Sequence, residues 1–311
     1  MNKVKLKIDA RSDTGVTRTN NEDSFGVFEK DNLFLVCDGM GGHRAGDYAS
    51  RLAVKTTLEM FDKLEEKNYR KISKDLKHEW EIASRLIAII RLANRMIFNR
   101  SLANPKRQGM GTTFSGLAIE DGCAISGHVG DSRIYRFRDG KMELLTEDHT
   151  WVNELILDKE IDAGQARKLG NKNVITRALG LEQTVKIDVR IDPLQEGDIF
   201  LLCTDGLTKA LPDDEIKRIV LYNKKRLSHT AKHLIDNANM KDGSDNSTVV
   251  IVAVENIFSI PGKKNATKMT LKAQDRRTSR IEMSLLKKYY PNSSISDRLK
   301  KFIKTVIVHK E

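Results

Sequence analysis

A chain of 311 residues with 39% hydrophobic and 31% charged side chains can bury a large core, which excludes a mainly disordered protein. No apolar run reaches membrane-spanning length, and the alternating first residues are unlike the continuous apolar segment of a signal peptide. We therefore expect a cytoplasmic protein.

The net charge of +11 is concentrated at the C-terminal end. Of the 54 basic and 43 acidic residues, 14 basic and 4 acidic ones lie in residues 261–311. Residues 1–260 are almost neutral as a consequence. The basic character belongs to a tail and not to the body, so overall charge gives no support to a nucleic-acid-binding protein.

The first half of the chain has the pattern of strands followed by helices. Apolar residues alternate or cluster in ways that predict strands over residues 1–9, 25–28 and 33–37. Apolar residues then recur at steps of three or four, which predicts helices over about 47–65 and 78–102.

The second half returns to strands. We expect strands over residues 113–119, 123–129 and 133–138, joined by Asp-Gly turns into an antiparallel meander. Residues 146–170 are irregular, with a short helix at 152–157, and are a candidate flap. The last predicted elements are strands at 199–203 and 248–254, with helices at 213–222 and 228–239 between them. Grouped strands with paired helices indicate a layered α+β fold with the sheets inside.

Aspartates stand where several of the strand-like runs stop. Asp38 follows the run 33–37, and Asp205 follows 200–204 in the same manner. Asp131 and Asp245 lie beside two further strands. Carboxylates gathered at strand ends without a Cys/His pattern suggest a site for hard cations held by oxygen.

The three cysteines, Cys37, Cys123 and Cys203, all lie in apolar strand-like runs. Their odd number and their spacing match no metal or disulfide framework, so we expect reduced core residues. A reactive thiol at Cys37, beside Asp38, is the alternative. Side chains alternate along a strand, which favours a Cys37 that faces away from its neighbour.

A series of short motifs occurs in one order along residues 8–256. The motifs are Arg18-Thr-Asn-Asn-Glu22-Asp23, Val36-Cys-Asp38-Gly39-Met-Gly-Gly-His43 with Gly46, Met110-Gly111-Thr112-Thr113, Gly130-Asp131-Ser132-Arg133, Thr146-Glu-Asp-His149, Ile175-Thr-Arg-Ala-Leu-Gly180, Asp205-Gly206 and Asp245-Asn246-Ser-Thr-Val-Val. In this order and over this length, the set resembles the metal-dependent protein Ser/Thr phosphatases of the PP2C type (the PPM family), in their bacterial form.

The resemblance implies a four-layer α-β-β-α sandwich, an α+β fold in which two antiparallel sheets are flanked by helix pairs, over residues 1–258. It implies two Mn²⁺ or Mg²⁺ ions, with a third as a further option. The implied reaction is hydrolysis of phosphoserine and phosphothreonine by attack of a metal-bridging hydroxide, without a covalent enzyme intermediate. The implied substrates are phosphorylated proteins, a kinase among them.

Roles carry over from the matching motif positions. Asp38 bridges both ions, Gly39 contributes its carbonyl, Asp205 and Asp245 complete the ligands, Glu22 and Asp23 hold metal-bound water, Asp131 supports the third ion, and Arg18 binds phosphate. Physical chemistry agrees, because two divalent ions lower the pKa of a bridging water and neutralise the phosphate. A planar guanidinium also grips phosphate in a way that lysine cannot.

Structural roles are the alternatives for these residues. Asp38, Asp205 and Asp245, taken singly, are ordinary turn aspartates, and Asp131 has a structural alternative as well. A surface ion pair is the alternative for Arg18, and a turn-forming role is the alternative for Glu22 and Asp23.

The proton donor to the leaving group is the least defined role. Animal members of the family place a histidine directly after Asp-Gly, whereas this chain has Met40 there. His43 is a candidate donor, and a metal-bound water or a local capping role for His43 are the alternatives. His128 and His149 are expected to have structural roles.

The basic extension, residues 259–311, has no counterpart in the resemblance. Residues 263–280 have the composition of a disordered linker, and apolar residues from Ile295 to Val306 fall on one helical face. The extension is either a solvated tail or a segment that docks on an anionic membrane surface or an acidic protein. Its apolar face distinguishes it from a plain arm that binds nucleic acid.

Two other functions remain open at this level. One is a non-catalytic module that binds phosphoproteins, against which the complete set of acidic ligands argues. The other is a hydrolase of small phosphorylated metabolites on the same fold.

Overall fold

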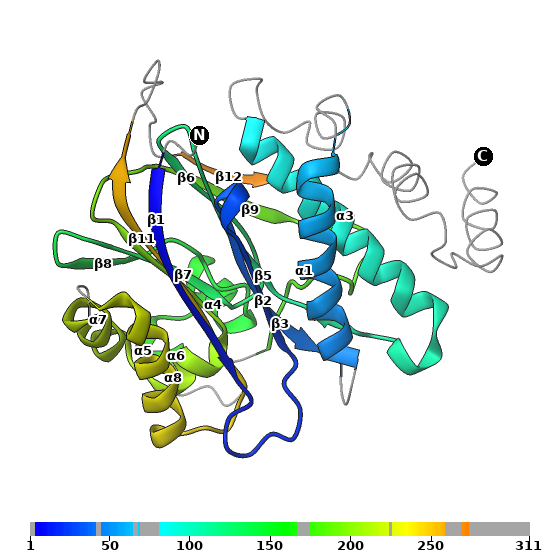
Figure 1. The fold of residues 1–311 in the computed structure, drawn as a ribbon. Coiled ribbons are helices and arrows are strands. Elements are labelled where there is room, and N and C mark those ends of the chain that lie inside the picture. The colour runs from blue at the N-terminus through cyan, green and yellow to red at the C-terminus, as the bar shows by residue number, and fades with distance from the viewer. Residues whose placement is uncertain are drawn as a thin grey trace.

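The computed structural model of the chain describes residues 4–41, 45–64, 68, 81–166, 174–223, 226–258 and 269–273 (Figure 1). Two sheets lie at its centre, and every pairing between the described strands is antiparallel. The five-stranded sheet contains, in spatial order, β1 (Val4–Asp13), β11 (Ser247–Ile257), β10 (Ile199–Cys203), β7 (Arg133–Arg138) and β8 (Lys141–Leu144). The seven-stranded sheet contains β12 (Met269–Ala273), β9 (Ile187–Pro193), β6 (Cys123–Val129), β5 (Phe114–Glu120), β3 (Leu33–Met40) and β2 (Asp23–Phe28), with β4 (Gly111–Thr112) paired to β3.

Helices cover the outer face of each sheet (Figure 1). The seven-stranded sheet is covered by α1 (Ala45–Lys63) and α3 (Glu81–Ala103), and the five-stranded sheet by α6 (Asp205–Ala210), α7 (Asp213–Tyr222) and α8 (Thr230–Lys241). The connecting segments hold α4 (Trp151–Leu157), α5 (Ala163–Ala166) and the 3₁₀ turns η1 (Glu29–Asp31), η2 (Pro105–Arg107) and η3 (Leu227–His229). Within the described residues, none of the helices is long and apolar enough to cross a membrane.

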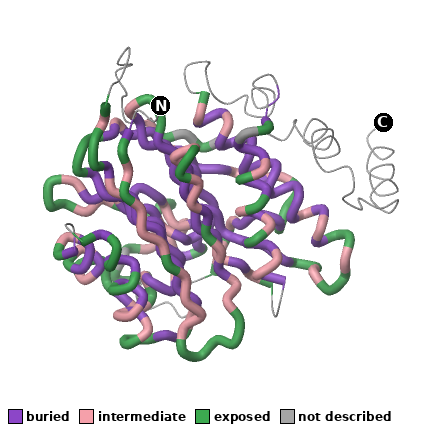
Figure 2. Tube along the Cα trace, in the orientation of Figure 1, coloured by how far each residue is buried: buried purple, intermediate pink, exposed green. Residues whose placement is uncertain are grey.

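Three hydrophobic cores separate these four layers. Figure 2 shows the buried segments running through the strands and the sheet-facing sides of the helices. Strand β3 illustrates the cause, because Leu33 and Leu35 pack towards α1 and α3 while Phe34 and Val36 pack between the sheets. A strand that is apolar on both faces has to be covered on both sides. The expected α-β-β-α sandwich is confirmed.

The expected antiparallel meander is correct for the two hairpins and wrong at the connection between them. Asp121-Gly122 and Asp139-Gly140 all have positive φ angles, between 49° and 74°, which suits tight two-residue hairpins. Strands β6 and β7 do not pair, however, since β6 lies in one sheet and β7 in the other. The chain crosses between the sheets at residues 130–132.

Strand β9 is absent from the sequence-based prediction, although its residues alternate. Ile187, Val189 and Ile191 lie in the core beneath the helices. On the opposite face Arg190 lies 2.7 Å from Asp192, so the buried carboxylate of Asp192 is held in an ion pair. The alternation of apolar and charged residues was the available signal for this strand. It was missed because the charged residues interrupt the apolar ones.

The prediction of a disordered linker over residues 263–280 is wrong for Met269–Ala273. These residues form β12 and pair with β9, from Met269 opposite Ile191 to Ala273 opposite Ile187. The backbone hydrogen bonds that the edge of β9 offers, together with the packing of Met269 against the core, explain why this short segment is ordered. The predicted helix at 295–306 lies outside the described residues.

Removing β12 should expose the edge of β9. A chain that ends at Phe258 is expected to exchange the amide hydrogens of residues 187–191 that face β12 about tenfold faster than a chain that ends at Ala273, because only the longer chain keeps the β12–β9 pairing. Hydrogen exchange measured by mass spectrometry checks this, with β5 as the internal reference. Equal protection of β9 in both chains would contradict the pairing.

Candidate metal centre

The ends of strands from both sheets deliver polar side chains to one end of the layer between the sheets. Asp38 continues the inter-sheet face of β3 after Phe34 and Val36. Thr204 continues the inter-sheet face of β10 in the same way, after Phe200 and Leu202. The apolar layer therefore ends in a polar group.

Asp23 lies directly opposite Asp38 in the pairing of β2 with β3. The hydroxyl of Thr204 donates to Asp23 Oδ2 at 2.8 Å and accepts from the backbone N–H of Thr248 at 2.9 Å. These bonds join the residue that follows β10 and the second residue of β11 to the first residue of β2. The two sheets are thereby connected at the carboxylates.

Backbone contacts hold the end of β3 in place. The N–H of Asp38 donates to Thr113 Oγ1 at 2.8 Å, and its carbonyl accepts from the N–H of Thr113 at 2.8 Å. The next residue has to be glycine, because a Cβ on Gly39 would overlap the carbonyl oxygen of Gly46. The carboxylate of Glu22 lies against Gly46, so Glu22 is close to the Asp38-Gly39 turn.

Asp131 lies on the segment that crosses between the sheets. Gly130 before it has a φ of 112°, and a Cβ there would meet the side chain of Thr113. Ser132 after it makes a 2.7 Å hydroxyl contact with Thr113, the residue that holds Asp38. The crossover therefore places Asp131 beside the end of β3.

Asp205 and Asp245 complete the group and are joined by a lysine. Asp205 is the first residue of α6, and Asp245 precedes β11. Lys209 Nζ lies 2.5 Å from Asp205 Oδ2 and 2.9 Å from Asp245 Oδ2. The other oxygen of Asp245 lies 3.0 Å from Arg18 Nη2.

Burial and repulsion from neighbouring carboxylates raise the pKa values of Asp38, Asp23 and Asp131. Burial is the main cause for Asp38, whose pKa is raised well above its usual range, with Asp23 and Asp205 adding repulsion. Burial likewise raises the pKa of Asp23 to about 7 against the hydrogen bonds from Thr248 and Thr204. The pKa of Asp131 is raised to about 7 by burial and by Asp205.

These residues suit a centre of divalent cations. Among the described residues, one oxygen each of Asp23, Asp131 and Asp205 is buried without a hydrogen-bond partner. A buried carboxylate oxygen without a donor is costly, and a bound hard cation removes that cost. In the part of the chain that the structure describes, no three His, Cys, Asp or Glu side chains lie in an arrangement that would already hold a metal ion.

The structure thus brings together every predicted site residue but one. His43 lies outside the described residues.

Cys37 is fully buried on the face towards the helices, and burial, with Asp23 and Asp38, raises the pKa of its thiol far above the ordinary value. A reactive thiol at Cys37 is therefore excluded, and all three cysteines are free and buried, as expected.

Sequence reasoning missed three polar residues of this centre. Thr204 and Lys209 contact the carboxylates directly. Asn246 accepts from the N–H of Glu22 at 2.9 Å and donates to the carbonyls of Thr14 and Asn20, which fixes the loop that carries Glu22. For Asn246 the signal was present in the motif that begins at Asp245, whereas nothing in the sequence marks Thr204 or Lys209.

Two buried histidines support the crossover segment. His149 Nδ1 accepts from the N–H of Gly130 at 3.0 Å, so its Nε2 carries the proton and faces Asp188 at 3.3 Å. His128 Nε2 donates to the carbonyl of Glu147 at 3.0 Å, and the two rings lie 4.7 Å apart. Both are structural, as expected.

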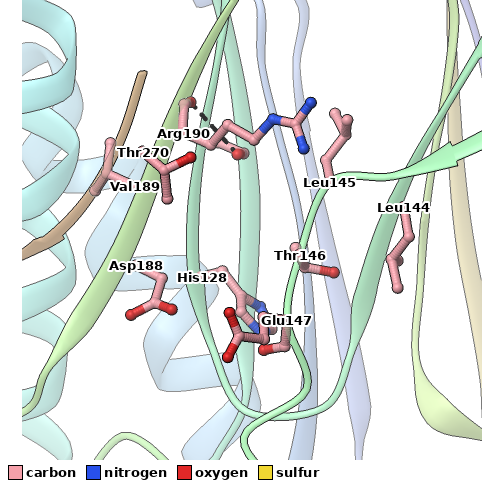
Figure 3. Close-up of a pocket in the computed structure, with 10 residues that line it drawn as sticks. His128, Leu144, Leu145, Thr146, Glu147, Asp188, Val189, Arg190 and Thr270 are labelled. Atoms are coloured by element: carbon pink, nitrogen blue, oxygen red, sulfur yellow. Dashed lines mark hydrogen bonds between the residues drawn. The ribbon is translucent and has the colours of Figure 1, made fainter. Parts of the chain in front are cut away.

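A cavity of about 190 Å³ is lined by His128, and none of the carboxylates of the candidate metal centre lines it (Figure 3). His128 and Asp188 point into it from β6 and β9, and Thr270 reaches it from β12. Lys272 Nζ of β12 lies 3.9 Å from Asp188 Oδ2 and 3.7 Å from Glu147 Oε1. Asp188 is connected to the centre through His149, which accepts from the N–H of Gly130, the residue before Asp131.

His128 should make the protein sensitive to acid. Burial, with the neighbouring His149, lowers the pKa of His128 to about 3, so the unfolded chain takes up a proton below pH 6.5 that the folded chain refuses. Stability should therefore fall by about 1.4 kcal/mol per pH unit from pH 6.5 towards pH 4. Urea unfolding at several pH values gives the free energy of unfolding as a function of pH. For His128→Gln this free energy is expected to fall less steeply with pH, by about the same 1.4 kcal/mol per pH unit. Parallel pH profiles for the two proteins would show that His128 is already charged in the fold.

Known proteins with the same features were found by sequence and by structure. The family model described as protein phosphatase 2C matches residues 16–241. The serine/threonine phosphatase stp of Listeria monocytogenes is 39% identical over 245 residues, which cover 78% of this chain and 93% of that protein.

Solved structures of serine/threonine phosphatases have the same fold as this chain. The Streptococcus agalactiae serine/threonine phosphatase superposes with a TM-score of 0.71 at 35% identity, covering 81% of this chain and 100% of the other. The catalytic domain of the serine/threonine phosphatase PstP, in complex with two manganese ions, superposes with a TM-score of 0.68 at 31% identity, covering 81% and 99%. The chain therefore belongs to the protein phosphatase 2C family, the metal-dependent protein-serine/threonine phosphatases, in its bacterial form.

Proposed function

We propose that residues 1–258 form a phosphatase domain that hydrolyses phosphoserine and phosphothreonine in proteins, with water as the nucleophile and no covalent enzyme intermediate. The observation that carries the proposal is the group of buried, unpaired carboxylate oxygens on Asp23, Asp131 and Asp205 at one end of the sandwich. A non-catalytic binding module has no need of such a costly group.

The ligands follow from the donor set. Asp38, the carbonyl of Gly39, Asp205 and Asp245 would hold two Mn²⁺ or Mg²⁺ ions, with Glu22 and Asp23 acting through bound water. Asp131 would support a third, weaker ion. When bound, such ions acidify water, neutralise the phosphate and align attack opposite the leaving oxygen.

The chain's own residues would bind the phosphate of the substrate and hold the acidic side chains in position. Arg18 is about half exposed and has a planar donor fork, so it can turn from Asp245 to the phosphate of a substrate. Thr113 and Thr204 hold the backbone of Asp38 and the carboxylate of Asp23. His43 is the proposed proton donor to the leaving alcohol, with a water on the centre as the alternative.

A comparison of substrates tests the proposal. The full chain would be incubated with a phosphothreonine peptide, an aryl phosphate and a small phosphorylated metabolite, each with Mn²⁺, with Mg²⁺ and with a chelator. Metal-dependent turnover that favours the peptide is expected, and preference for the metabolite would replace the proposed substrate class. Failure of folded, metal-loaded protein to hydrolyse any of them would indicate a binding module. An autophosphorylated kinase is the protein substrate to test next.

The basic extension is proposed to hold the cytoplasmic enzyme at an anionic membrane surface. The support is the apolar helical face of residues 295–306 within a segment of strong positive charge. Vesicles with phosphatidylglycerol should co-sediment with the full chain and not with a chain that ends at Ala273. Equal sedimentation of both chains would remove the membrane role, and an acidic protein partner would then be sought.

A further inference from the structure

Lys209 has a position that an ordinary surface lysine does not have. It lies one helical turn after Asp205 on α6, and its ammonium reaches Asp205 Oδ2 at 2.5 Å. The same ammonium donates to Asp245 Oδ2 at 2.9 Å, across 36 positions of sequence. One lysine therefore joins two carboxylates that come from different parts of the chain.

A comparison within the chain shows what is unusual. Lys232 and Asp236 on α8 also form an ion pair one turn apart, at 2.5 Å, but their side chains are 56% and 39% exposed. Those of Lys209 and Asp205 are 31% and 13% exposed. An exposed pair of this kind contributes only a few tenths of a kcal/mol, whereas a charge that faces partly buried carboxylates is screened much less.

The charges around Lys209 explain why it remains there. Burial lowers the pKa of Lys209, but the attraction of Asp205 and the hydrogen bonds to Asp205 and Asp245 outweigh that effect and raise it. Lys209 also lowers the pKa of Asp131, against burial and the repulsion from Asp205. Its ammonium is thus a cation that the chain itself supplies to a group of repelling carboxylates.

The same oxygens are needed for metal. Asp205 and Asp245 both belong to the proposed ligand set, and each gives one oxygen to Lys209. A divalent ion and an ammonium cannot share these positions, because like charges at contact distance repel strongly in a partly buried site. Lysine is a compact charge on a flexible stem of four methylene groups, and this stem is about a third exposed, so it can turn towards solvent.

We propose that the ammonium of Lys209 is a displaceable counter-ion of the metal centre. It offsets part of the negative charge of Asp205 and Asp245 in the metal-free protein, and it moves away when these carboxylates ligate a divalent ion. Lys209 therefore weakens the affinity of the centre for metal and stabilises the fold without it. The inference rests on the proposed metal-dependent function and deepens it.

Calorimetric titration with MnCl₂ tests the proposal on the full chain, after chelation and desalting. Lys209→Met keeps most of the length of the side chain and removes its charge. We expect this variant to bind Mn²⁺ about tenfold more tightly than the unaltered chain, or about 1.4 kcal/mol. In chelator it should unfold at a lower temperature than the unaltered chain, and Mn²⁺ should abolish that difference. Lys232→Met is the matched control and should leave both quantities unchanged.

A second measurement needs no variant and covers the case in which Lys209→Met fails to fold. Acetylation of lysines by an N-hydroxysuccinimide ester, read by peptide mass spectrometry, should increase at Lys209 when Mn²⁺ is added and stay constant at Lys232. Labelling of Lys209 that is unchanged or reduced by Mn²⁺ would overturn the proposal.

The possible outcomes distinguish the counter-ion role of Lys209 from the proposed metal-dependent function. Equal or weaker Mn²⁺ binding by folded Lys209→Met, with binding intact in the unaltered chain, overturns the counter-ion role alone. Absence of Mn²⁺ binding by the unaltered chain overturns the proposed function and the counter-ion role together.

Discussion

Replacing Asp38 with asparagine is expected to lower Mn²⁺-dependent hydrolysis of a phosphothreonine peptide by about a thousandfold or more. The change preserves the shape of the side chain and removes one negative charge from the centre of the carboxylate group. Divalent ions contribute several kcal/mol of charge stabilisation to such reactions, and about 4 kcal/mol corresponds to a thousandfold in rate. Single-turnover and steady-state rates at saturating Mn²⁺ provide the measurement.

The fold itself should tolerate this change. Burial and the repulsion of Asp23 and Asp205 raise the pKa of Asp38, so a neutral amide relieves strain in the metal-free protein. We expect chelated Asp38→Asn to unfold at the same temperature as the unaltered chain or higher. Asp236→Asn, on the exposed side of α8, is the control and should keep full activity. Hydrolysis that survives in Asp38→Asn would remove Asp38 from the proposed ligand set.

Metal removal is expected to have the second large effect, this time on stability. At a metal concentration one hundred times the dissociation constant, a ligand that binds only the folded state adds about 2.7 kcal/mol. For a chain of this size that corresponds to a fall of about 5 °C or more in the unfolding temperature when a chelator is added. The buried, unpaired oxygens of Asp23, Asp131 and Asp205 are the physical reason. Differential scanning calorimetry at pH 7.5, with Mn²⁺ and with chelator, measures it.

Asp205→Asn provides the comparison for that experiment. With one proposed ligand weakened, the temperature shift on adding Mn²⁺ should shrink to less than half of that of the unaltered chain. An unfolding temperature that is the same with Mn²⁺ and with chelator, in an enzyme that is active with Mn²⁺, would show that the folded centre does not depend on the ions for its stability.

Much of the fold was predictable, because periodicity and turn chemistry are local. The runs around Phe34 and Leu201 are apolar on both faces, which identifies strands that lie between two layers. The Asp-Gly pairs at 121–122 and 139–140 predicted hairpins that the positive φ angles confirm. The edge strand β12 was missed because it depends on pairing with β9 and not on its own sequence.

The sequence by itself determined the layered α+β class, the family and the acidic residues from which a metal centre can be built. It did so because strand alternation and motif spacing are written in neighbouring residues. Only the tertiary structure decided that the chain crosses between the sheets at Gly130–Ser132, which places Asp131 beside Asp38. It alone joined Lys209 to Asp245, since that contact spans 36 positions and depends on where α6 begins. Pairings of this kind come from the packing of the two sheets, which no local pattern records.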